Sequence, residues 1–168
     1  FATALQGFLR GKVAPGHLEE QLNYVARHHE ATKQTERMER IRMALRLARS
    51  LGTWPDQARR ASLAHVARAY AEHGGHVDWA RRYLIGGDET AELATAFRLL
   101  TDHVRQRREQ QNKHFADVLA AWHKVPTATE GLLPIEQTLA RIVASLAKAT
   151  AVLLLVMDGM SYADFCEL

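Results

Sequence analysis

Apolar residues recur at helical spacing along most of the chain and predict a series of amphipathic helices. The clearest pattern covers residues 38–51, where apolar positions three and four residues apart form one face and arginines and glutamates fill the other. A similar pattern over residues 17–30 predicts a helix before it. Residues 89–123 predict one long helix whose middle, residues 105–113, is polar on all sides, so that part is either exposed to solvent or bent.

Helix start and stop signals divide the region between these runs. Gly52 is placed to end the helix over 38–51, and the segment Thr53–Asp56 reads as the start of another, because Pro suits a first helical turn. The pair Gly74-Gly75 predicts the end of that helix. Asp78 then predicts the N-cap of a short helix that Gly86-Gly87 closes.

The pattern changes near the C-terminal end. Residues 125–133 hold two glycine or proline breakers and predict a linker. A helix from Pro134 to about Lys148 is expected to turn one apolar face inward, formed by Ile135, Leu139, Ile142, Val143 and Leu146. The run Ala151–Met157 has no polar alternation, which predicts a strand buried on both faces of a parallel sheet.

These elements predict a mainly α chain with two parts. Residues 1–131 form a helical domain, and residues 132–168 are the start of an α/β domain that holds the first strand and its flanking helices. Because a lone strand cannot bury both of its faces, we expect the sequence to be an excerpt of a longer protein.

Composition and charge narrow the class of protein. Hydrophobic residues make up 47% of the 168 residues and charged residues 24%, which is typical of folded domains. The most apolar stretch, residues 149–157, has nine residues, and a membrane-spanning helix needs about 20, so no membrane contact is expected. The single cysteine, Cys166, excludes an internal disulfide and suits a reducing compartment, so a cytoplasmic location is predicted.

Asp158 is the main candidate for chemistry because it closes the predicted strand. Ligands of open α/β sheets bind outside the carboxyl ends of the strands, where a rigid carboxylate can meet a metal. Gly159 would let the backbone turn sharply there, and Ser161 can cap the helix that follows. Met160 stands where a haloacid-dehalogenase-like site has a second Asp, and Gly159 where a Walker B strand has Glu. The alternative is that Asp158 only caps a turn.

The residues Val152–Tyr162 resemble the opening of the PglZ domain, a branch of the alkaline phosphatase superfamily found in BREX and Pgl phage-defence systems. Residues Leu133–Glu136 are similar to the lead-in of that domain in type 2 BREX members. Looser similarity extends to Trp79–Arg82 and Phe115–Trp122. The specific part of the resemblance covers about 30 residues.

The resemblance implies that Asp158 is a ligand of a divalent metal, usually zinc, with manganese and magnesium as alternatives. It also implies that the nucleophilic Ser or Thr and the other Asp and His ligands come later in the family's sequence. The excerpt alone is therefore expected to be inactive, because a tightly held metal needs three or four ligands. Ser161 does not occupy the family's nucleophile position, and helix capping is the favoured role for it.

The resemblance further implies a phage-defence protein whose complete form hydrolyses phosphoesters with metal assistance, while the helical region contacts partners or substrate. The alternative is a non-catalytic scaffold that binds other defence proteins or DNA. A third reading, a plain helical protein with a chance match, would be supported if residues 151–157 were helical.

Histidines, arginines and tryptophans offer weaker candidates. The pairs His28-His29 and His73/His76 lack the spacing of a metal site, so solvated roles are favoured over metal ligation. Arginine doublets at 59–60, 81–82 and 107–108 usually form a solvated helix face. With a net charge of +3 and a pI of about 9.2, they also allow contacts to a phosphate backbone. The three tryptophans, Trp54, Trp79 and Trp122, are most simply core residues.

Overall fold

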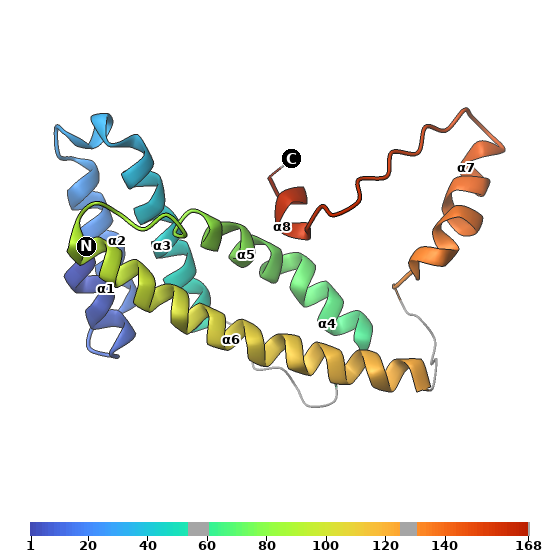
Figure 1. Ribbon diagram of the computed structural model, residues 1–168, viewed down its shortest axis with the longest axis horizontal. Helices are drawn as coiled ribbons and strands as arrows, with labels where there is room; N and C mark the ends of the chain where they lie inside the picture. The colour runs from blue at the N-terminus through green and yellow to red at the C-terminus, as the bar shows by residue number, and fades with distance from the viewer. Residues whose placement is uncertain (54–60, 125–130, 168) are drawn as a thin grey trace.

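The computed structural model describes residues 1–53, 61–124 and 131–167, and these residues are mainly helical. Figure 1 shows a helical bundle at one end, a long helix running out of it, and a C-terminal stretch that leaves the long helix and returns to the bundle's flank. The α-helices, in chain order, are α1 (Ala2–Leu9), α2 (Pro15–Ala26), α3 (Thr35–Thr53), α4 (Leu63–Ala69), α5 (Gly75–Arg82), α6 (Ala91–Lys124), α7 (Ala144–Ala147) and α8 (Tyr162–Phe165).

The core lies where α1, α2, α3 and α5 meet the first half of α6 (Figure 1). Helix α1 packs along α6, and α3 lies between α2 and α5. The predicted helices over 17–30, 38–51 and 89–123 are confirmed as α2, α3 and α6. The largest side chains that are completely buried come from four of the five helices: Leu5, Leu18, Leu47, Phe97, Leu100 and Val104.

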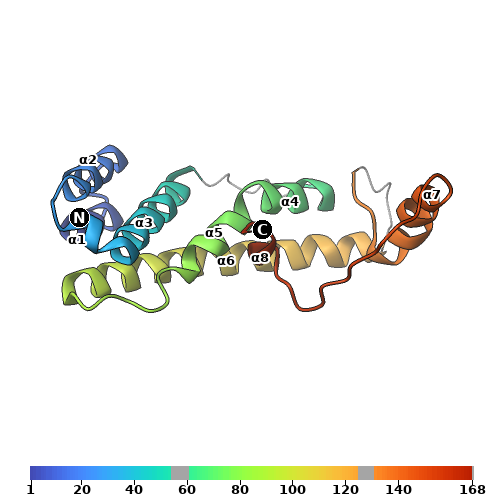
Figure 2. The same cartoon turned by 90° about the horizontal axis from the view of Figure 1, so that it is seen from above.

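Helix α6 is one continuous helix of 34 residues, about 50 Å long at 1.5 Å per residue. Its buried positions all lie in its first half and end at Val104. The polar middle predicted at 105–113 therefore marks the point where the helix leaves the core. Figure 2 shows the second half extending well beyond α1, α2 and α3.

Gly74-Gly75 does not end a helix, which corrects the prediction made from the sequence. A π-helical turn over Tyr70–Gly74 joins α4 directly to α5. Both glycines are buried with ordinary helical backbone angles, so they serve close packing and not a turn. A Cβ atom at Gly74 would stand 2.3 Å from the Tyr70 ring, and one at Gly75 would stand 2.4 Å from the Tyr162 ring.

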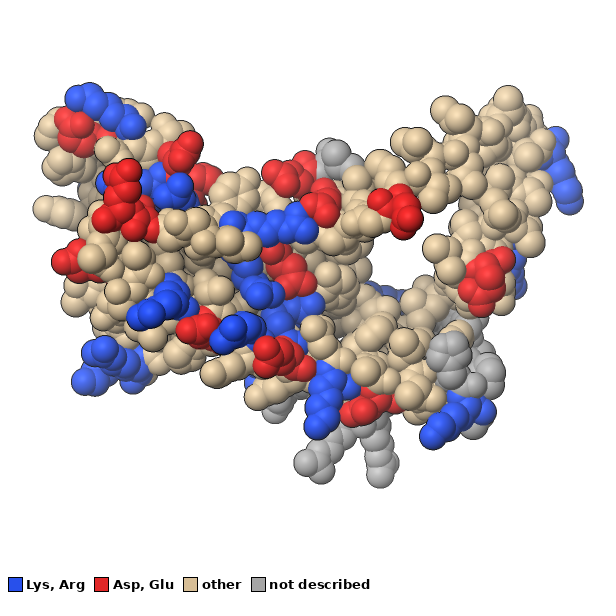
Figure 3. Space-filling view, in the orientation of Figure 1, with Lys and Arg blue, Asp and Glu red and all other residues tan. Residues whose placement is uncertain are grey.

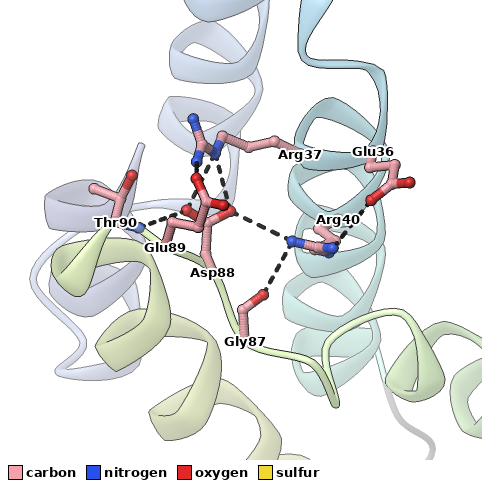
Figure 4. A network of polar contacts seen from close by, with 7 residues as sticks. All are labelled: Glu36, Arg37, Arg40, Gly87, Asp88, Glu89 and Thr90. Carbon is pink, nitrogen blue, oxygen red and sulfur yellow. Dashed lines mark hydrogen bonds and ion pairs between the residues drawn. The ribbon is translucent and has the colours of Figure 1, made fainter.

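Asp88 joins α3 to the start of α6 (Figure 4). Its side chain is 0% exposed and accepts hydrogen bonds from Arg37 Nε at 3.0 and 3.1 Å and from the Thr90 backbone N–H at 2.9 Å. Arg40 donates to the Gly87 carbonyl oxygen at 3.2 Å and lies 3.7 Å from the same carboxylate. Burial alone would raise the pKa of the Asp88 carboxyl, but the bonds from Arg37 and Thr90 outweigh it and lower that pKa.

The helix predicted from Pro134 to Lys148 forms in pieces and does not bury its apolar face. A 3₁₀ turn over Ile135–Gln137, a π-helical turn over Leu139–Val143 and α7 follow one another. The expected inward face is wrong, because Ile135, Leu139, Ile142 and Leu146 are exposed, Ile135 by 88%. Among the described residues no neighbouring element covers them (Figure 1).

Residues 151–157 form neither a helix nor a strand. They run as an extended segment with every side chain exposed, Leu153 by 94%. A strand exists only through hydrogen bonds to a neighbouring strand, and the described residues offer none. The predicted strand is therefore not seen, nor is the helix that would have supported the chance-match reading. The proposed boundary at residue 131 adjoins residues 125–130, which lie outside the described residues, as does most of the start signal at 53–56.

Candidate functional site

Asp158 lies in an exposed turn at the end of the extended segment. Gly159 adopts a φ of +76°, so the sharp turn expected of that glycine is confirmed. Throughout the described parts of the chain, no group of three or more His, Cys, Asp or Glu side chains is placed to hold a metal ion. A lone carboxylate does not fit a tightly bound zinc ion, so these residues do not by themselves make the metal site that the resemblance implies.

Ser161 caps α8, as predicted. Its hydroxyl oxygen accepts a hydrogen bond from the Asp164 backbone N–H at 3.3 Å, while the Asp164 carboxylate accepts from the Ser161 backbone N–H at 3.0 Å. This reciprocal pair is a capping box. The Ser161 hydroxyl also donates to Asp164 at 2.8 Å, so the side chain is engaged in local structure.

Arg82 of α5 anchors this capping box to the helical bundle. Its guanidinium donates to the Ser161 hydroxyl oxygen at 2.8 Å and forms an ion pair and hydrogen bonds with the Asp164 carboxylate. The hydrogen bond from Arg82, followed by those from Ser161, holds the pKa of the Asp164 carboxyl far below its usual value. Arg82 thus links α5 to Ser161 and Asp164, which lie 79 and 82 positions after it in the sequence.

Tyr162 provides the apolar half of the same contact. Its ring lies against Gly75 and 5.7 Å from the Tyr70 ring, and its hydroxyl donates to the Ala71 carbonyl oxygen at 3.3 Å. The next residue, Ala163, is buried. We call the contact of α8 with Gly75, Arg82 and Ala71 the α8 dock.

A second polar cluster centres on Asp78, in the middle of α5. Asp78 was expected to be an N-cap, but its carboxylate accepts two hydrogen bonds from Arg108 of α6, at 3.1 and 2.9 Å. Arg81 donates to it at 3.2 Å and the Tyr70 hydroxyl at 3.3 Å. Arg108 also lies over the Tyr70 ring, 5.0 Å from its centre, and only 11% of its side chain is exposed. Burial, followed by the nearby Asp78 charge, raises the pKa of Tyr70.

One arginine doublet, Arg81-Arg82 of α5, lies close to Arg108 of α6, which belongs to a second doublet. These three arginines line a cavity of about 310 Å³, together with Asp78, Ile85, Thr101 and Asn112. Figure 3 shows basic side chains gathered over the middle of this face, with acidic groups between them. The doublet at 59–60 lies outside the described residues.

The histidine and tryptophan candidates from the sequence lie in ordinary structural surroundings. The rings of His28 and His29 stack 4.5 Å apart, and His73 and His76 are exposed on the helical stretch that includes α5. Trp79 packs partly buried against the core, as predicted, 5.4 Å from the Tyr83 ring. Trp122, by contrast, is half-buried near the end of α6 and is not among the core residues, and Trp54 lies outside the described residues.

Sequence patterns did not reveal the roles of Asp78, Asp164 or Tyr162. Each acts on a residue distant in the sequence, such as Arg108 for Asp78, and helical periodicity carries no information on such pairs. The one available signal was Gly75, because a glycine inside a helix often marks a close approach.

Comparison with protein-family models, curated proteins and solved structures found no match for this chain. The PglZ resemblance thus rests on the motif residues alone and stays a prediction. No helix in the described ranges is both long and apolar enough to cross a membrane.

Proposed function

We propose that this chain is the helical part of a cytoplasmic, PglZ-type phage-defence protein, in which α5 positions the segment that carries Asp158. The observation that supports this proposal is the α8 dock. Arg82 and Gly75 hold α8 from one side, and Asp158 lies three residues before Ser161, which begins the capping box. A docked α8 fixes one end of the turn, which limits the positions open to the Asp158 carboxylate.

The extended segment supports the second half of the proposal, an α/β domain that begins near residue 132. Residues 151–157 are apolar, extended and exposed, and their backbone groups make no hydrogen bond with other described residues. Such an edge is suited to pairing with further strands. We propose that these residues enter a parallel sheet in the complete protein, with Asp158 at its carboxyl end as one ligand of a zinc, manganese or magnesium ion.

The proposed activity is metal-dependent hydrolysis of a phosphoester by the complete protein, with the helical bundle contacting substrate or other defence proteins. It is tested with a chromogenic phosphodiester and added zinc, manganese or magnesium. Asp158→Ala is expected to abolish turnover, and Arg82→Gln to reduce it several-fold because α8 loses its anchor. Arg105→Gln removes an equal charge from exposed α6 and is the matched control, expected to keep the wild-type rate.

Two results would contradict the enzyme proposal. One is a wild-type protein that folds by circular dichroism and hydrolyses nothing with any of the three metals. The other is an Asp158→Ala variant with the wild-type rate. Either result would favour the scaffold alternative, in which the helices bind defence partners or DNA and the fold lacks catalysis.

A further inference from the structure

Residues 151–157 present an unpaired backbone edge on the outside of the molecule. They are extended, every side chain is exposed, and their backbone groups make no hydrogen bond with other described residues. In Figure 1 they run between α7 and α8 without lying along any helix of the bundle. The run holds seven apolar residues and no charge, proline or glycine, which is typical of segments that pair readily with another strand.

The order of residues in this run is symmetrical about Leu154. Residues 152–156 read Val-Leu-Leu-Leu-Val in both directions. In an antiparallel pair of two copies with a two-fold axis at Leu154, Val152 lies opposite Val156 of the second copy, and Leu153 lies opposite Leu155. A two-fold interface requires a patch that is complementary to itself, and this order meets that requirement.

The charges at the two ends of the run favour the antiparallel orientation. Lys148 precedes the run and Asp158 follows it. An antiparallel pair brings the Lys148 end of one copy beside the Asp158 end of the other, so opposite charges meet at both ends. A parallel pair would align lysine with lysine and aspartate with aspartate, and like charges opposite each other are destabilising.

Each copy also carries an apolar helical face that can cover the paired strands. An isolated pair of strands is only marginally stable in water, whereas packing against a helix stabilises it. The helical stretch over 135–147 is joined to the run by residues 148–150, and four of its apolar side chains are exposed: Ile135, Leu139, Ile142 and Leu146. Two copies together therefore supply both the strand pair and the helical faces to cover it.

We propose that residues 151–157 form an interface between two copies of this chain, as an antiparallel strand pair centred on Leu154. The core of the bundle takes no part in this interface, so dissociation in dilute solution returns a folded monomer. A strand has two edges, and pairing with a second copy along one edge leaves the other for the sheet proposed for the complete protein. The interface does not depend on a metal or on the metal-dependent activity proposed above.

Disulfide trapping in the 168-residue chain tests the register of the pair. The background is Cys166→Ser, which removes the single native thiol. Leu154→Cys is expected to cross-link two copies under a mild oxidant, because opposite residues of an antiparallel pair have Cα atoms about 4.5–5.5 Å apart, within the span of a disulfide. Leu153→Cys is the matched control, since the two copies of that position lie diagonally across the pair at roughly 7–8 Å. Mixing Leu153→Cys with Leu155→Cys should restore cross-linking.

Sedimentation velocity over a range of concentrations tests the association itself. Wild type is expected to pass from monomer to dimer as its concentration rises. Leu154→Lys should weaken dimerisation by about tenfold or more, since it removes a leucine from each copy at the axis and places two like charges opposite each other. Tyr24→Lys changes an exposed residue of α2 and should keep wild-type dimerisation. Circular dichroism checks that both variants fold.

Three results would overturn the proposal. The first is a wild-type chain that stays monomeric at every concentration. The second is equal cross-linking of Leu153→Cys and Leu154→Cys, because parallel or irregular contact brings both positions together. The third is equal weakening by Tyr24→Lys and Leu154→Lys, which would show that association does not depend on residues 151–157.

Discussion

The helical bundle and the segment 131–157 both carry apolar side chains, but only the bundle covers them. Phe97 is 1% exposed and contacts a core built from five helices, whereas Leu153 is 94% exposed and contacts none of them. The difference does not lie in the hydrophobicity of the residues. It lies in whether a second apolar face is present to pack against. The helices of the bundle provide such faces to one another, whereas the described part of the C-terminal segment has none.

The α8 dock connects these two regions. It brings the chain back to α5 through the Arg82–Asp164 ion pair, the capping box of α8 and the Tyr162 ring, which packs against Gly75. The apolar segment before α8 therefore has its C-terminal end held by the dock, while its apolar side chains face solvent. Such a segment is suited to pairing with another apolar surface without unfolding the bundle.

Phe97→Ala tests the bundle side of this comparison and should have the largest effect. Removing a fully buried ring leaves a cavity and lowers the free energy of unfolding by about 3–5 kcal/mol. Urea denaturation followed by circular dichroism measures the loss. Phe165→Ala is the matched control, since that ring is exposed and its removal should cost under about 1 kcal/mol. Equal losses would show that the core is not where the structure places it.

Asp88→Asn tests the polar link inside the bundle. The variant keeps the shape of the side chain and removes the charge that Arg37 and Arg40 contact, so unfolding free energy should fall by about 2 kcal/mol at pH 7. The pKa of Asp88 is lowered in the folded protein, so its contribution is full above the unfolded-state pKa, ordinarily 3.8, and is lost as the pH falls below that value. The gap between wild type and variant should close below about pH 4. A constant gap from pH 7 to pH 3 would contradict this role.

Gly75→Ala tests the connection between the two regions. A Cβ atom there would stand 2.4 Å from the Tyr162 ring, so α8 should lose protection while the bundle stays folded. Hydrogen exchange of residues 161–167 measures this loss, expected at about 1–2 kcal/mol of local stability. Gly16→Ala, in α2 with nothing within 4 Å of its added Cβ, should leave α8 unchanged. Unaltered protection in Gly75→Ala would argue against the α8 dock.

Leu153→Ser should have the smallest effect. The side chain is exposed, so the free energy of unfolding should change by less than about 0.5 kcal/mol. The same urea titration measures it. A large loss in the 168-residue chain would mean that Leu153 is buried in solution, and the contrast between the two regions would fail.

Periodicity located α2, α3 and α6 because each presents an apolar face to a core within the chain. It could not separate a glycine that ends a helix from one that admits a neighbouring ring, and so Gly74-Gly75 was misread. The prediction that the apolar face over residues 135–146 is buried was wrong for a related reason. An amphipathic pattern shows that a helix has an apolar face, but it does not show that another element packs against that face. Capping of α8 by Ser161 was predictable since it depends on residues three positions apart. The hydrogen bond between Arg108 and Asp78 joins residues 30 positions apart, and local sequence patterns do not predict contacts of that kind.

The packing of α1 on α6 has a consequence for how the protein is made. Helix α1 leaves the ribosome before α6, which begins 89 residues later, at Ala91 against Ala2. At about 5–20 residues per second, the N-terminal helix waits roughly 5–20 seconds before its main partner is synthesised. During that interval the face of α1 that packs against α6 stays uncovered, so the nascent chain is an expected client for a chaperone that binds short apolar segments.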